Sequence, residues 1–358
     1  MATVSPSVFQ ALIAWSSGHL SIFDDSYKLT ALKARSRALG AMCEVLSTKA
    51  STVPDQEANL ATALVLVANE IGLNSGSEWY EHLKGARDII ISAESSGPGG
   101  RSLQGSQVFK TSSDGQWLLR NFAYHDVLSS IISGRGLLIE DNYLDDISVE
   151  TDSYLGAAFP VMKLISKICS LRYPHARDQE IDPFLTSINT FWDNCYYLES
   201  ILQEWTCKST TKTSLSALAN SYRSAGLICL YRHMRTWAME DFAGPGYSKQ
   251  ELCMMISNAV DAIMTNLSLI PVTDGAVCGL LFPLFMAGGE TTEQKHIETI
   301  RSRLSYMLKE RGFQNVRRAL DTLEQVWQQS CSGPSHDESG MMDWATLLEG
   351  SEDMLILT

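Results

Sequence analysis

The sequence lacks the short motifs that mark the commoner enzyme and binding-module classes. Its eight cysteines form no C-x-x-C pair, and none has zinc-site spacing to a nearby histidine, which favours free thiols in a reducing compartment. It contains no G-x-S-x-G elbow, no P-loop, no H-E-x-x-H pair and no dinucleotide fingerprint. We therefore expect no metal site and no cofactor.

Long apolar runs and an excess of basic charge are missing as well. The longest apolar run, 276–287, contains Gly279 and Pro283 and is shorter than the ~20 residues that a bilayer-spanning helix needs. The N-terminus lacks the charged and apolar regions of a signal peptide. We expect an intracellular protein of the cytoplasm or nucleus, with no membrane partner. The net charge of −13 repels phosphate backbones, so we expect no direct nucleic-acid binding by this chain.

The residues that are present indicate a helical protein. Apolar residues make up 45% of the 358 positions, and they recur at spacings of three and four rather than alternating. This pattern predicts an all-α fold, a single large domain of about a dozen antiparallel-packed helices over 1–330. We expect helices near 5–20, 26–48, 56–73, 78–93, 115–133, 154–171, 182–206, 213–240, 248–266, 275–287, 292–310 and 313–330.

Glycine and serine predict where this helical pattern is interrupted. The stretch 94–106 is rich in both and should not hold a helix, so we expect a mobile loop over about 94–114. Asp55 and Ser77 are candidate caps of the two helices that follow them. The tail, 331–358, begins as a linker and continues as an acidic amphipathic segment, for which we favour docking on the domain over a free activation segment.

The segment 79–90 carries the most specific pattern in the chain, W-x-x-H-L-x-G-A-R-x-I-I. It resembles the fungal-specific transcription factor domain, the helical regulatory half of many fungal zinc binuclear-cluster regulators. Further similar segments follow in the family's order at 9–20, 31–46, 61–72, 122–138, 282–290, 311–327 and 342–348. The resemblance covers nearly the whole chain and implies a helical regulatory domain.

One departure from the family pattern bears on function. The family's zinc cluster supplies six closely spaced cysteines beside a basic segment, and this sequence has neither. We therefore expect no DNA-binding module in this chain, which is compatible with a longer regulator from which an upstream portion is missing and with a natural stand-alone protein.

Aromatic and methionine residues supply the candidate ligand-binding positions. Many fall on one face of the helices predicted at 182–206 and 213–240, an apolar surface with a few polar tips. Such a surface suits a terpenoid, sterol or polyketide, and it equally suits an ordinary helix–helix core. The candidates are Trp192, Tyr196, Tyr231, Trp237, Met255 and Phe282.

The most catalytic-looking side chains lie on the helix predicted at 115–133 and just after it. His125 and its neighbour Tyr124 would face a cavity with Arg135 close by; the alternative is a packed helix end. Adjacent helical residues point ~100° apart, so His125 and Asp126 cannot form a dyad.

Two functions from different classes remain. The first is a regulatory domain that binds an apolar metabolite or a protein partner, with a homodimer among the arrangements left open. The alternative is a repurposed enzyme of fungal secondary metabolism that uses no cofactor. It would act as a cyclase, isomerase or Diels–Alderase-type pericyclase on a terpenoid or polyketide intermediate. It would accelerate the reaction by holding that intermediate in a reactive conformation.

Overall fold

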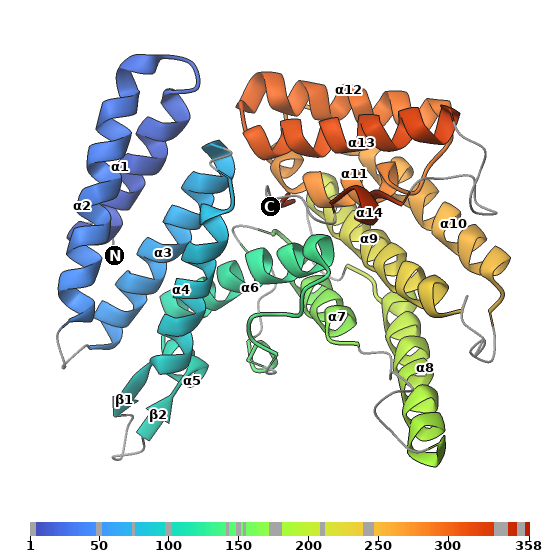
Figure 1. Ribbon diagram of the computed structural model, residues 1–358, viewed down its shortest axis with the longest axis horizontal. Coiled ribbons are helices and arrows are strands. Elements are labelled where there is room, and N and C mark those ends of the chain that lie inside the picture. The colour runs from blue at the N-terminus through green and yellow to red at the C-terminus, as the bar shows by residue number, and fades with distance from the viewer. Residues whose placement is uncertain are drawn as a thin grey trace.

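The computed structural model describes most of the chain, and the helices of this part are accompanied by a single two-stranded hairpin (Figure 1). The described residues are 5–47, 52–73, 76–96, 102–140, 143–147, 152, 155–171, 181–207, 212–238, 247–332, 343–348 and 355–358. The all-α prediction is confirmed. No helix in these ranges is long and apolar enough to cross a membrane.

The helices that the sequence pattern predicts are present in the expected order, together with two short ones, α5 and α14. They are α1 Pro6–Leu20, α2 Lys28–Leu46, α3 Val53–Leu73, α4 Glu78–Ser92, α5 Ser106–Phe109, α6 Ser113–Ser133, α7 Phe159–Cys169, α8 Ile181–Glu204, α9 Thr213–Trp237, α10 Lys249–Ser268, α11 Leu281–Gly288, α12 Gln294–Arg311, α13 Gln314–Ser332 and α14 Trp344–Leu348. Two 3₁₀ turns, η1 Asp25–Tyr27 and η3 Gly275–Gly279, lie before α2 and α11.

Helix α9 lies at the centre of the C-terminal half and contacts α7, α8, α10 and α11. Its small residues let these neighbours approach closely. At Gly226, an added Cβ atom would lie only 3.1 Å from Cγ1 of Ile165 on α7. In the N-terminal half, α1 pairs with α2, and both α1 and α4 pack on α3. The α1–α2 hairpin forms one end of the molecule (Figure 1).

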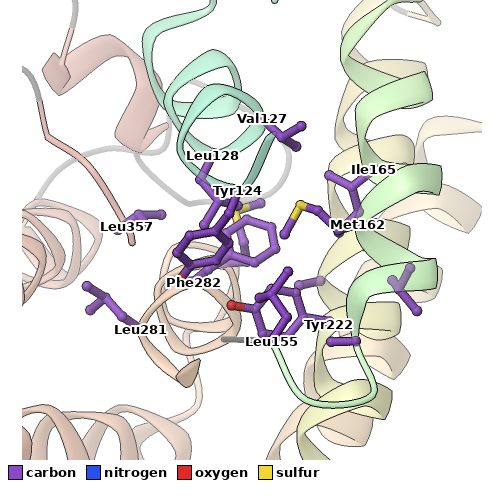
Figure 2. Packing of buried hydrophobic residues seen from close by; sticks show 14 of the residues in the cluster. Tyr124, Val127, Leu128, Leu155, Met162, Ile165, Tyr222, Leu281, Phe282 and Leu357 are labelled. Carbon is purple, nitrogen blue, oxygen red and sulfur yellow. The ribbon is translucent and has the colours of Figure 1, made fainter. Parts of the chain in front are cut away.

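The largest apolar side chains fill the space between these helices. Figure 2 shows Tyr124 of α6, Met162 of α7, Tyr222 of α9 and Phe282 of α11 in one cluster. All eight residues of α11 are buried, which explains why this helix is apolar on every side. Leu357 near the C-terminus is also fully buried in this core.

The structure corrects the prediction of a loop over about 94–114. Residues Glu94–Ser96 (β1) and Ser102–Gln104 (β2) pair as an antiparallel hairpin, and α5 follows directly. Residues 97–101 of the predicted loop lie outside the described residues. Val108 and Phe109 of α5 are fully buried, so packing of these two side chains outweighs the low helix propensity of the surrounding glycines and serines.

Two boundaries also differ from the prediction. The helix expected over 275–287 is η3 followed by α11, and Pro283 lies in the first turn of α11, where its missing N–H costs no helical hydrogen bond. Asp55 is not the cap of α3. Thr52 precedes the helix and donates its backbone N–H to the Asp55 carboxylate at 3.0 Å, while its hydroxyl accepts from the Asp55 N–H at 3.4 Å.

Candidate functional site

A cavity of about 780 Å³ lies where α6, α7, α9, α10, α12 and α14 converge. This volume is within the range of small-molecule sites. Its lining residues are Ser130, Ile131, Gly134, Arg135, Ile168, Cys169, Leu171, Cys229, Arg232, His233, Arg235, Thr236, Cys253, Ile256, Ser257, Val260, Met286, Gly289, Glu290, Thr291, Thr292, Glu293, His296, Asp343, Trp344 and Ala345.

The lining is part apolar and part charged. Ile131 and Ile168 contribute aliphatic groups from α6 and α7, and Ile256 and Val260 do so from α10. These four side chains also belong to the hydrophobic core or pack against it, so the apolar part of the cavity wall is continuous with the core. The apolar part can hold a hydrocarbon body, and the charged groups can fix the orientation of a polar one.

The charged part is built around one buried carboxylate. Glu290, whose side chain is only 3% exposed, accepts hydrogen bonds from the guanidinium groups of Arg232 and Arg235. The contact to Arg235 measures 3.1 Å, and Arg232 also reaches the Asp343 carboxylate at 2.8 Å. Arg232 and Arg235 lie three residues apart on α9, so both point to the same side of that helix.

The C-terminal helix α14 forms one wall of the cavity through Trp344. The Trp344 side chain is buried against Phe285, with ring centroids 5.3 Å apart, and the Arg232 guanidinium lies 4.4 Å from the centre of its ring. Gly289 makes this position possible, because a Cβ atom there would lie 2.4 Å from the Trp344 ring. The indole N–H of Trp344 meets no hydrogen-bond acceptor within the ranges that the structure describes.

Burial shifts the ionisation of the charged groups. It lowers the pKa of Arg232, an effect that the neighbouring Asp343 carboxylate opposes. Burial is the largest single influence on the Asp343 carboxyl and would raise its pKa, but the charge and hydrogen bond of Arg232, the Ala345 N–H and the Arg235 charge together lower the pKa below its usual value. Both groups are therefore ionised at neutral pH, and the ion pair persists.

The predicted aromatic residues come together next to this cavity rather than in it. Trp192 and Tyr196 of α8 stack with centroids 6.2 Å apart, while Tyr231 of α9 donates to the buried Glu199 carboxylate at 2.9 Å. His233 joins the cluster to the cavity, because it lines the cavity and its ring lies 6.5 Å from that of Trp237.

The other predicted ligand residues lie apart from this cluster. Phe282 is fully buried in the core, where its ring lies 5.5 Å from Tyr222 (Figure 2). Met255 is half-buried on α10 and packs against the core. Neither is among the residues that line the cavity.

The structure separates the three catalytic candidates. Tyr124 and His125 are buried within α6, and neither lines the cavity. Burial lowers the pKa of His125 to about 3, so this imidazole is neutral near pH 7. Arg135 follows the left-handed Gly134 at the end of α6 and does line the cavity; its guanidinium lies 5.3 Å from the Tyr80 ring.

Sequence reasoning missed the charged part of the cavity. Arg232 and Arg235 drew no attention because an i, i+3 pair of arginines on a helix is common on solvent-exposed faces. The segment Gly288–Gly289–Glu290 held the available signal, since two glycines before a carboxylate indicate a close approach of another element. The approaching element, α14, is encoded more than 50 residues later in the printed sequence.

No group of three histidine, cysteine, aspartate or glutamate residues with metal-binding geometry occurs in the described part of the chain. Cys169, Cys229 and Cys253 do line the cavity, and burial raises the pKa of the Cys229 thiol well above its usual range. This thiol is protonated at neutral pH and has little nucleophilic character.

The comparisons with known proteins identify the family. The family model of the fungal specific transcription factor domain matches residues 1–357, and the chain belongs to that family. No curated protein and no solved structure matches it. Family membership supports a regulatory role.

Proposed function

We propose that this chain is the regulatory domain of a transcription regulator and binds a small amphipathic molecule in the cavity beside α9. The observation that carries the proposal is the division of the cavity lining between aliphatic residues of α7 and α10 and the charged groups of α9 and α14. A cavity formed only by imperfect packing would be apolar throughout or filled by its own side chains.

The lining narrows the chemical class of the ligand. The sequence led us to expect a terpenoid, sterol or polyketide on the aromatic face of α8 and α9; we now propose that the body of such a ligand occupies the aliphatic part of this cavity. Arg135 lines the cavity, its side chain is exposed, its guanidinium lies against the Tyr80 ring, and no ion pair joins it to a carboxylate within the described ranges; a carboxylate or other hydrogen-bond acceptor on the ligand would be recognised there. We therefore favour an acidic or hydroxylated member of these classes over a pure hydrocarbon.

Two further parts of the proposal concern partners and location. The chain acts in the nucleus or cytoplasm, and with a net charge of −13 it does not itself bind DNA. A gel-shift assay at physiological salt tests this, and DNA binding by the purified chain would contradict it.

Ligand binding is tested by calorimetry and thermal shift with pairs of terpenoid, sterol and polyketide compounds that differ only in a carboxyl group. A ligand that binds only the folded state stabilises it by about 2.7 kcal/mol at a hundredfold excess over Kd. Ser257→Trp should block binding, because Ser257 lines the cavity on α10. The matched control is Asn258→Trp on the same helix, outside the lining, which should leave binding unchanged.

A second candidate is the cofactor-free cyclase, isomerase or pericyclase. Arg135 and His233 favour it, since guanidinium and imidazole groups in a cavity can polarise a ligand carbonyl. Recovery of the bound compound distinguishes the two functions. An unchanged compound supports the regulatory domain, and an isomerised or cyclised one supports the enzyme.

A further inference from the structure

Three cysteines line the cavity, and two of them lie on neighbouring helices. Cys169 is the last residue of α7, Cys229 lies in the middle of α9, and Cys253 lies on α10. The structure holds all three as thiols. In intracellular proteins, disulfides are usually transient and serve catalysis or redox sensing. Two thiols that face one another at this wall would therefore make a modification site, and the packing of α7 on α9 shows how they lie.

Two close contacts fix the direction and register of α7 against α9. Gly156, just before α7, approaches Leu215 so closely that an added Cβ atom would lie 3.1 Å from the leucine Cδ2 atom. Gly226 approaches Ile165 in the same way, at 3.1 Å. The contacts join residues 59 and 61 positions apart, and the two residue numbers rise together. The segments therefore run parallel.

The two thiols lie at one level of this parallel pair and on one side of it. Cys229 follows Cys169 by 60 positions, which matches the register. Cys169, four positions after Ile165, is turned ~40° from the contact in one sense. Cys229, three positions after Gly226, is turned ~60° in the other sense. On parallel helices, opposite turns point to the same side of the contact, and both residues accordingly line the same cavity.

The close approach of the two helices brings the thiols within bonding range. Helix axes lie ~8 Å apart where a small residue is at the contact, and Cα atoms lie ~2.3 Å from their axis. With these dimensions, the Cα atoms of Cys169 and Cys229 are about 5–6 Å apart, and disulfides join Cα atoms at roughly 4.4–6.8 Å. Ionisation agrees with this proximity. The pKa of Cys229 is raised first by burial and then by the charge of Cys169, a contribution that requires the two sulfur atoms to be near one another.

We propose that Cys169 and Cys229 form a thiol–disulfide modification site on the cavity wall, which small disulfides oxidise to a bond between α7 and α9. In the first step, the Cys169 thiolate attacks one sulfur of the small disulfide, forms a mixed disulfide and releases the other half as a thiolate. In the second step, Cys229 loses its proton, and its sulfur attacks that of Cys169 and releases the remaining half. The protein loses two electrons and two protons, and the small disulfide takes them up as two thiols.

The surroundings of the two thiols set the order of these steps. Cys169 is half-buried, and its thiol donates to the Val127 carbonyl oxygen at 3.9 Å. Cys229 is buried, and its thiol is protonated at neutral pH, so it does not start the reaction. Once the mixed disulfide has formed, its sulfur is held beside Cys229, and this proximity accelerates the second step.

Incubation of the native chain with hydroxyethyl disulfide tests the site. Peptide mass spectrometry, after the remaining thiols are blocked, should locate a bond between positions 169 and 229. The oxidised chain should have a higher thermal midpoint than the reduced chain, because the bond constrains the unfolded state. Dithiothreitol should reverse both changes.

Two alanine variants separate this pair from the third thiol in the cavity. Cys229→Ala should stop the reaction at the mixed disulfide on Cys169, which then accumulates. Cys253→Ala is the matched control, because Cys253 lines the same cavity but lies beside Arg235, whose Nη1 atom is 3.8 Å from its sulfur. Arg235 is about 9 Å further along α9 than Cys229, so this variant should form the bond like the native chain. Circular dichroism checks that both variants are folded.

Two results would overturn the proposal. One is a native chain that carries the mixed disulfide on Cys169 and never forms the bond to Cys229. The other is a bond from either residue to Cys253. The site goes beyond the proposed ligand binding, which is measured separately, so failure of one is distinguishable from failure of the other.

Discussion

The Arg232 guanidinium lies over the Trp344 ring, 4.4 Å from its centre, and joins the central helix α9 to the C-terminal helix α14. The same guanidinium is held by Glu290 and Asp343, so the contact is fixed on both sides. Cation–π contacts of this kind contribute about 0.5–2 kcal/mol, more where water is excluded. These contacts hold α14 in place as one wall of the cavity.

Removing the Trp344 ring should destabilise the domain strongly. Trp344→Ala empties a buried site, which typically lowers the free energy of unfolding by about 3–5 kcal/mol. The change is measured by urea denaturation. Trp117→Ala is the control, because Trp117 is 36% exposed, and its loss should cost clearly less. Equal costs for the two variants would show that the Trp344 ring contributes no more to stability than a half-exposed one.

Adding a methyl group at Gly289 should displace α14 without touching its sequence. In Gly289→Ala the new Cβ atom would lie 2.4 Å from the Trp344 ring, so the ring or the backbone must move. We expect a loss of about 1–3 kcal/mol from overpacking. Gly85→Ala on α4 is the matched control: nothing lies within 4 Å of its added Cβ, and it should stabilise the helix by about 0.5–1 kcal/mol. Thermal denaturation measures both effects: the midpoint should fall in Gly289→Ala and rise in Gly85→Ala, relative to the native chain.

Neutralising Glu290 should leave two guanidinium groups in the cavity without their shared counter-charge. Glu290→Gln is expected to cost about 3 kcal/mol, the lower end of the range for broken buried pairs, because both arginines retain some exposure. Glu324→Gln breaks a more exposed pair with Arg301 and should cost less than about 1 kcal/mol. Chemical denaturation of the two variants compares them; a cost at Glu290 no larger than at Glu324 would refute the buried network.

Asp126 should make stability depend on pH. Burial raises its pKa to about 7, although the carboxylate accepts hydrogen bonds from the N–H groups of Leu138, at 2.9 Å, and Ile139. Between its unfolded pKa of 3.8 and about 7, the folded state keeps a proton that the unfolded chain releases. Stability therefore falls as pH rises through this window, by up to about 1.4 kcal/mol per pH unit, and levels off above it.

Asp126→Asn removes the titrating group but keeps a carbonyl oxygen as an acceptor. The contribution of this site to the pH slope should disappear in the variant. Urea denaturation at about pH 5, 6 and 7 gives the slope of each protein. An unchanged slope in the variant would assign the pH dependence to other groups.

The sequence could predict the helices because their signal is local. Spacings of three and four specify which face of each segment is apolar, and α3, α6 and α9 appear close to their expected bounds. Helix α5 escaped prediction because it is held by the burial of Val108 and Phe109 where it packs on α3, α4 and α6. The glycine- and serine-rich composition around α5 does not indicate that burial.

For the candidate site, too, some features have a local signal in the sequence and others depend on how distant helices pack. Composition, periodicity and motif are properties of the chain itself, so an acidic, all-helical chain of a regulatory family with aromatic residues gathered on α8 and α9 could be predicted from the sequence. The contact of Tyr231 with Glu199 and the position of the cavity beside the aromatic residues depend on how the helices pack. Arg232, Glu290 and Trp344 come together through the packing of distant helices, and no local pattern encodes which helices meet.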